Sequence, residues 1–134
     1  MNERDDVINT LRRLFKGGLL RRMPRSNDDS QIIMALSLLG LDPNQIYDES
    51  DINVELSAWL DGIADENGTA DYVAMRRDLV DHGFLRRATD GAIYRISRER
   101  IDDTLSEAAR SVNPKAIFTE LELERHQRKE AFRQ

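Results

Sequence analysis

The chain of 134 residues contains no cysteine, and this absence removes several classes of chemistry at once. Disulfide bonds and thiolate nucleophiles are excluded, and a structural zinc site would lack its usual sulfur ligands. The two histidines, His82 and His126, lie far apart in the sequence without companions at metal-ligand spacing. We therefore expect neither a metal centre nor a cofactor.

Long apolar runs are also absent. The longest run, IIMALSLLGL, is about half as long as a membrane-spanning helix requires. The first residues, MNERDDV, are acidic and polar, unlike a signal peptide. With 40% hydrophobic and 34% charged residues, the composition predicts a small, water-facing, cytoplasmic protein with a real core.

Catalytic signatures are missing as well. The segment KGGLL lacks the spacing and the lysine of a phosphate-binding loop, and DPNQIYDESD lacks the glycine and the final glutamate of a calcium loop. No serine or threonine has the setting of an activated nucleophile. We expect that the protein is not an enzyme.

Basic residues are absent from the middle of the chain. Residues 27–75 hold eleven acidic residues and no lysine or arginine, whereas residues 1–26 hold seven basic against three acidic residues. Residues 76–100 hold seven basic against four acidic residues. Charge blocks of this kind act on partners more than on the fold. The basic residues are mostly arginine, which pairs well with either carboxylate or phosphate.

Apolar residues recur at helical spacing along most of the chain. This spacing predicts a first helix that ends at Gly17, a connection broken by Pro24, and helices at residues 31–39, 49–63 and 70–82, with a brief extended piece at 45–47. The segments FLRR and AIYRI then flank ATDG, which predicts a β-hairpin with its turn near Asp90–Gly91.

The last part of the chain returns to a helical pattern. A helix from residue 97 is predicted to carry a narrow apolar seam, and Asn113–Pro114 ends it. A final helix then becomes polar towards residue 134. The seam consists of Ile101, Leu105, Ala108 and Val112.

This order of elements is typical of a winged helix-turn-helix. The predicted fold is mainly α, of the α+β class, with a winged-helix-like core, a small β-wing and flanking helices at both ends. We expect a domain at residues 1–96, including the N-terminal helix, and a C-terminal helical extension at residues 97–134.

Four segments also carry a family resemblance: FKGGLLRRMP, YDESDINVEL, DYVAMRRDLVDHGFLRR and DGAIY. They resemble the successive motifs of a family of small bacterial domains catalogued only as a domain of unknown function. The resemblance covers about residues 15–96. It implies a winged-helix-like fold, and some members of that family are attached to ArsR-type transcriptional regulators. No activity is implied.

The positions of Arg76 and Arg77 on the helix predicted at residues 70–82 indicate whether these arginines stabilise the fold or bind nucleic acid. On a helical wheel Arg76 falls inside the apolar stripe, so we expect it to bond a carboxylate or a backbone carbonyl, with Asp51 or Glu55 as candidate acids. Arg77 lies at the edge of the stripe and could serve either role. Three aspartates on the opposite face disfavour base reading in the major groove.

Two interpretations of the other arginines stay open. Those of the hairpin and of the basic segment at residues 12–25 could form one phosphate-binding patch, if that segment packs beside the wing. Alternatively, they neutralise the acidic block within the chain. The candidate phosphate-binding residues are Arg21, Arg22, Arg25, Arg77, Arg86, Arg87 and Arg95.

The apolar seam of the tail also has two interpretations. It could pair with a second copy across a twofold axis, or it could fold back onto the chain's own core. From these patterns we expect a non-enzymatic, winged-helix-like interaction module that self-associates and serves transcriptional regulation. The alternative is direct DNA binding through the basic wing and the N-terminal basic segment.

Overall fold

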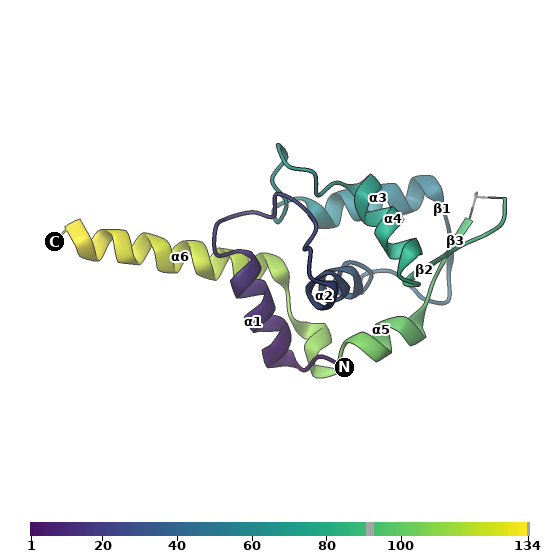
Figure 1. The fold of residues 1–134 in the computed structure, drawn as a ribbon, viewed down its shortest axis with the longest axis horizontal. Coiled ribbons are helices and arrows are strands. Elements are labelled where there is room, and N and C mark those ends of the chain that lie inside the picture. Colours follow the sequence, from purple (N-terminus) through teal and green to yellow (C-terminus); the bar gives the residue numbers. More distant parts are fainter. Residues whose placement is uncertain (91–92, 134) are drawn as a thin grey trace.

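The computed structural model describes residues 1–90 and 93–133, which form a mainly helical body with one small sheet (Figure 1). This confirms the mainly helical α+β prediction. The helices are α1 (Arg4–Leu14), α2 (Asn27–Ser37), α3 (Glu49–Leu60), α4 (Tyr72–Asp81), α5 (Arg98–Thr104), the 3-10 helix η1 (Ala108–Ser111) and α6 (Pro114–Arg133). The strands are β1 (Ile46–Asp48), β2 (Leu85–Arg87) and β3 (Ile93–Ile96).

Side-chain caps decide where several helices begin. The Ser26 hydroxyl accepts a hydrogen bond from the Asp29 backbone N–H, so α2 begins at Asn27 and not at residue 31 as predicted. Asp71 caps α4 in the same way through the Ala74 N–H, so α4 begins at Tyr72 and not at residue 70 as predicted.

Helix α2 lies at the centre of the core. It is apolar on most sides, and Ile33, Met34 and Ala35 are completely buried. A helix that is hydrophobic all round must be enclosed by other elements, and α2 lies against α4 and α5. One continuous hydrophobic cluster joins side chains of α1 to α5, η1 and α6. Helices α5, η1 and α6 therefore contribute to the same core as α1 to α4.

The three strands form an antiparallel sheet with β3 between β1 and β2. The predicted β-hairpin is thereby confirmed, while its turn at Asp90–Gly91 lies partly outside the described residues. Because side chains alternate along a strand, Tyr94 and Ile96 enter the core and Arg95 faces solvent.

The single helix predicted from residue 97 is wrong. Helix α5 ends at Thr104, Leu105 is extended, and η1 follows. The N-terminus explains the break, because the Asn2 N–H donates to the Thr104 carbonyl at 2.7 Å and the Ser106 N–H donates to the Asn2 carbonyl at 2.9 Å. These bonds engage backbone groups that a continuous helix would need.

Helix α6 begins against α1 and then leaves the body. Ile117 and Leu121 are buried, and the Phe118 ring meets Phe15 edge-on with the ring centroids 5.5 Å apart. Further along, the helix projects away from all other elements (Figure 1).

Candidate nucleic-acid interface

The solvent-facing side of the sheet brings two arginines together. The β2–β3 register sets Arg86 directly opposite Arg95, and both residues are exposed. Like charges in directly opposed positions destabilise a sheet. Among the described residues, no carboxylate lies within ion-pair distance of either guanidinium. The pair is therefore available to an external anion.

Neighbouring residues on this face do not neutralise the pair. Ile46 lies beside Arg95 on β1, and Ile93 lies opposite Asp48; both isoleucines are partly exposed. The Asp48 carboxylate instead accepts a hydrogen bond of 2.7 Å from the Asp51 N–H and caps α3. The face thus presents two guanidiniums beside two apolar side chains.

The opposite side of the wing forms a cavity with α4. Arg87 is the cross-strand partner of Tyr94, and with Arg77 it lines a hollow of about 410 Å³. Glu49, Arg76, Val80 and Asp81 complete the lining. Arg77 and Arg87 have no ion pair within the described chain, so arginines without a carboxylate partner flank the wing on both sides.

Arg76 is held between α3 and α4. Its side chain is 16% exposed, and its guanidinium lies 3.2 Å from Glu49 Oε1 and donates to Asn53 Oδ1. The acid is Glu49 and not the expected Asp51 or Glu55, because residues 49 and 53 are one turn apart on the side of α3 that faces α4. Asp51 and Glu55 are exposed on the other side.

Tyr94 adds to this cluster. Its hydroxyl donates to Glu49 Oε1 at 3.4 Å, so the wing is connected to the α3–α4 ion pair. Neither Glu49 nor Asn53 was singled out from the sequence. Their spacing of four residues, at the start of a helix with a buried stripe, is the signal that could have identified them.

The outward face of α4 is poor in hydrogen-bond donors. Asp71 and Asp81 are exposed and Arg77 is the one basic residue among the exposed positions of the helix. Burial raises the pKa of Asp78 above its ordinary value, an effect that His82 opposes and Asp81 reinforces. An acidic face of this kind does not suit insertion into the major groove, where base edges are read.

Residues 19–96 match the model of a family described as "Uncharacterized protein conserved in bacteria (DUF2087)". The chain belongs to this family. The matched residues include the wing, α4 and Arg76, whereas α1 and α6 lie outside them. No curated protein and no solved structure matches the chain.

In this DUF2087 chain the basic N-terminal segment does not lie beside the wing. The Leu20 N–H donates to the Ile63 carbonyl at 2.8 Å, and the Thr69 N–H donates to the Arg21 carbonyl at 2.7 Å. These bonds hold the segment against the loop after α3, at the other end of the body from the β2–β3 hairpin (Figure 1). A single patch that joins the segment to the wing is therefore not formed.

Several arginines of the N-terminal half are already paired. Arg13 makes two hydrogen bonds of 2.7 Å with Asp29, and these bonds hold the pKa of that carboxyl below its ordinary value against the opposing effect of burial. Arg12 bonds Glu124 on α6 at 2.9 Å and likewise lowers the pKa of that carboxyl.

The three candidate arginines of the N-terminal segment line a separate groove. Arg21, Arg22 and Arg25 border a hollow of about 650 Å³ together with Gly18 and Thr69. Arg21 lies 3.8 Å from Asp65, while the other two have no ion pair within the described residues. This groove is distinct from the cavity beside the wing.

The candidate self-association seam is mostly enclosed by its own chain. Ile101, Leu105 and Val112 are buried in the core, and Ala108 is exposed on η1. Because α5 ends before η1 begins, the four residues do not share one helical face. They do not offer the apolar seam that was expected.

Within residues 1–90 and 93–133, no group of three or more histidine or acidic side chains is arranged to hold a metal ion. None of the helices that the structure describes is long and apolar enough to cross a bilayer.

Proposed function

We propose that this chain is a non-enzymatic, winged-helix-like module that binds the backbone of duplex DNA through its wing. The order α2, β1, α3, α4 and the β2–β3 hairpin supports the winged-helix assignment. The observation that carries the function is the opposed pair Arg86 and Arg95, which has no carboxylate partner in the described residues. Phosphate is the anion that such a pair suits best in a DNA complex.

The proposed contact grips DNA without reading much of its sequence. Arg87 on the wing and Arg77 on α4 line one hollow, so four guanidiniums can approach the backbone around one hairpin. The acidic outward face of α4 opposes deep insertion into the major groove, so specificity is expected to be low. Such a module fits a cytoplasmic protein that assists transcriptional regulation.

Fluorescence anisotropy with a mixed-sequence duplex tests this function. If four guanidiniums each neutralise one phosphate, affinity falls roughly a hundredfold between about 50 and about 200 mM salt. We expect the Arg86→Ala/Arg95→Ala variant to bind at least about tenfold more weakly at low salt. A wild-type chain that does not bind duplex DNA at low salt contradicts the proposal.

Arg22→Ala/Arg25→Ala is the matched control. It removes the same formal charge from two arginines that also lack ion pairs but lie in the N-terminal groove. A loss of affinity equal to that of the wing variant would mean that net charge, not the wing, governs binding.

A second role, self-association, is favoured by a different observation, the exposed end of α6.

A further inference from the structure

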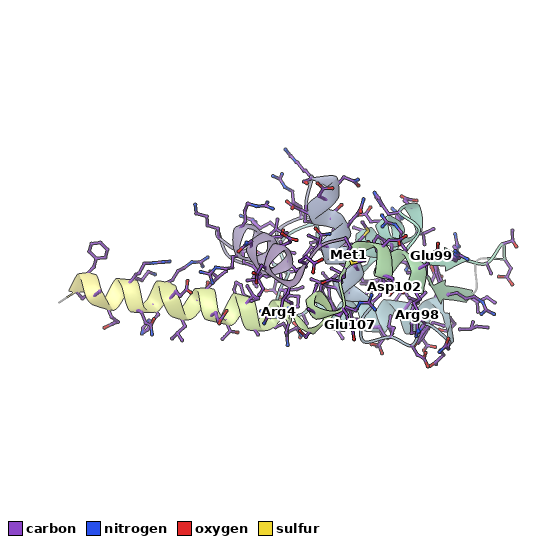
Figure 2. The ribbon with its side chains drawn as sticks, turned by 90° about the horizontal axis from the view of Figure 1, so that it is seen from below. Met1, Arg4, Arg98, Glu99, Asp102 and Glu107 are labelled. Carbon is purple, nitrogen blue, oxygen red and sulfur yellow. The ribbon has the colours of Figure 1, made fainter. Side chains whose placement is uncertain are left out.

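The end of α6 is a helical arm without a partner. The arm comprises residues 126–133, all of which are exposed. Just before it, Arg125 donates to the Phe15 and Lys16 carbonyls at 2.8 and 2.6 Å and fixes α6 to the end of α1. Beyond Arg125 the helix leaves the body, and its side chains radiate into solvent (Figure 2).

The arm is the exposed continuation of an anchored helix. Its eight residues give about two turns. Phe132 is 92% exposed near its tip. On the helical wheel Phe132 continues the stripe of Ile117 and Leu121 that packs on α1, so the anchoring face of α6 extends onto the arm.

The arm is also basic. Arg128, Lys129 and Arg133 outnumber the single acid, Glu130, which lies 3.5 Å from Arg133. Arg128 and Lys129 have no ion pair within the described chain. The chemistry of the arm therefore complements a surface that is acidic and can accept one aromatic side chain.

The acidic middle of the same chain provides such a surface. A groove of about 690 Å³ runs between α3 and the loop that leads to α4, and no basic side chain is among the described residues that line it. Val54, which is 64% exposed, and Tyr72 give the groove apolar patches. Its acids are Asp61, Asp65, Glu66 and Asp71.

We propose that the arm of one copy docks in the acidic groove of a second copy. Phe132 contacts Val54 and Tyr72, and the basic side chains of the arm face Asp61 and Glu66. The arm cannot reach the groove of its own chain, because α6 points away from the body (Figure 1). Opposite charge on the two surfaces of one sequence favours a second copy over an unrelated protein, and a reciprocal exchange of two arms closes a twofold dimer.

Sedimentation velocity on the full chain over a range of concentrations tests the docking. We expect a dimer at low salt that dissociates as salt is raised. The Phe132→Ala variant is expected to dimerise at least about tenfold more weakly, as for the loss of a buried aromatic anchor. Leu123→Ala is the control, because Leu123 is exposed on another side of α6, outside the arm, and should leave dimerisation unchanged.

Charge reversal makes the test specific. Arg128→Glu/Lys129→Glu reverses the charge of the arm. Asp61→Lys/Glu66→Lys reverses the two groove acids that the arm faces and leaves Asp65 and Asp71 in place. Each variant alone should be monomeric, whereas an equimolar mixture should form a heterodimer because both of its interfaces are complementary. A wild-type chain that stays monomeric at low salt overturns the proposal, and so does a dimer that survives arm reversal. DNA affinity of the Phe132→Ala variant, which keeps the wild-type net charge, separates DNA binding by the wing from dimerisation.

Discussion

Arginines at the two ends of this molecule have different surroundings. Near α1 and α6, Arg12 and Arg13 are bound to Glu124 and Asp29. On the wing, Arg86 faces another arginine and no carboxylate is within reach in the described chain. The difference shows that residue type alone does not set the role. The carboxylates that the fold brings close decide whether an arginine stabilises the protein or remains available to a partner.

The largest loss of stability is expected where the basic N-terminal segment approaches the loop after α3 most closely. A Cβ at Gly68 would lie 2.3 Å from the backbone oxygen of Arg21, so Gly68→Ala must push the basic segment off the loop after α3. We expect a loss of about 3 kcal/mol in the free energy of unfolding. Urea unfolding followed by circular dichroism measures it.

Gly17→Ala is the control for that change. A Cβ at Gly17 would meet nothing within 4 Å, and the residue does not need a positive φ. Its effect should stay within about 0.5 kcal/mol. Equal effects at the two glycines would show that the segment is not held by close backbone approach.

The next largest effect is expected from the Arg13–Asp29 pair. Arg13→Ala leaves the Asp29 carboxylate, whose side chain is only 11% exposed, without its charged donor. We expect a loss of about 2 kcal/mol. Arg25→Ala, at an exposed arginine without an ion pair in the described chain, should change the free energy of unfolding by less than about 0.5 kcal/mol. Similar losses for both would erase the distinction between paired and unpaired arginines.

Arg76 and Arg77 allow the same comparison within one helix. Arg76→Ala removes the bonds to Glu49 and Asn53 and should cost about 1.5 kcal/mol, since the released Glu49 is partly solvated. Arg77→Ala should leave stability nearly unchanged and weaken DNA binding. Thermal unfolding and anisotropy on both variants distinguish these outcomes, and a destabilised Arg77 variant would contradict them.

The pH dependence of stability gives a smaller effect. The pKa of Asp29 is lowered in the folded state, so its contribution is complete above the unfolded pKa, near 3.9, and is lost as pH falls through the folded value. The difference in unfolding free energy between wild type and Asp29→Asn should therefore be about 1 kcal/mol or more at pH 7 and should shrink below pH about 4. A difference that does not change with pH would exclude this ion pair as its source.

Periodicity predicted much of the fold because its causes are local. Apolar stripes at helical spacing, glycines at helix ends and the turn residues of the hairpin predicted most elements. The apolar stripe of residues 70–82 also correctly predicted that Arg76 is partly buried. The break after Thr104 was not predictable, because Asn2, more than a hundred residues earlier, supplies the competing backbone bonds. For that reason the predicted seam residues Ile101, Leu105, Ala108 and Val112 do not share one helical face.

Ion-pair partners were harder to predict than burial. The choice of Glu49 over Asp51 depends on which side of α3 meets α4, and that crossing is a tertiary property. The separation of the basic segment from the wing is likewise tertiary, since it depends on the bonds from Leu20 and Arg21 to the loop after α3. The opposition of Arg86 and Arg95 depends on the strand register, which the sequence of the turn alone did not fix.

The smallest stability effect is expected on the wing. Because Arg86 and Arg95 repel one another, Arg86→Ala should leave the free energy of unfolding unchanged or raise it by a few tenths of a kcal/mol. Differential scanning calorimetry at low salt, where the repulsion is least screened, is the suitable measurement. A clear decrease in the stability of the variant would mean that Arg86 has a structural role, and it would contradict the assignment of Arg86 to the DNA-binding surface.

The salt dependence of DNA affinity tests the central claim most directly. Wild type, Arg86→Ala/Arg95→Ala and Arg22→Ala/Arg25→Ala would be titrated against the same duplex over a series of salt concentrations. We predict that the slope of log affinity against log salt falls in magnitude by about two in the wing variant and stays unchanged in the other. Equal slopes for wild type and the wing variant would contradict the account, because the wing arginines would then release no counterions from DNA.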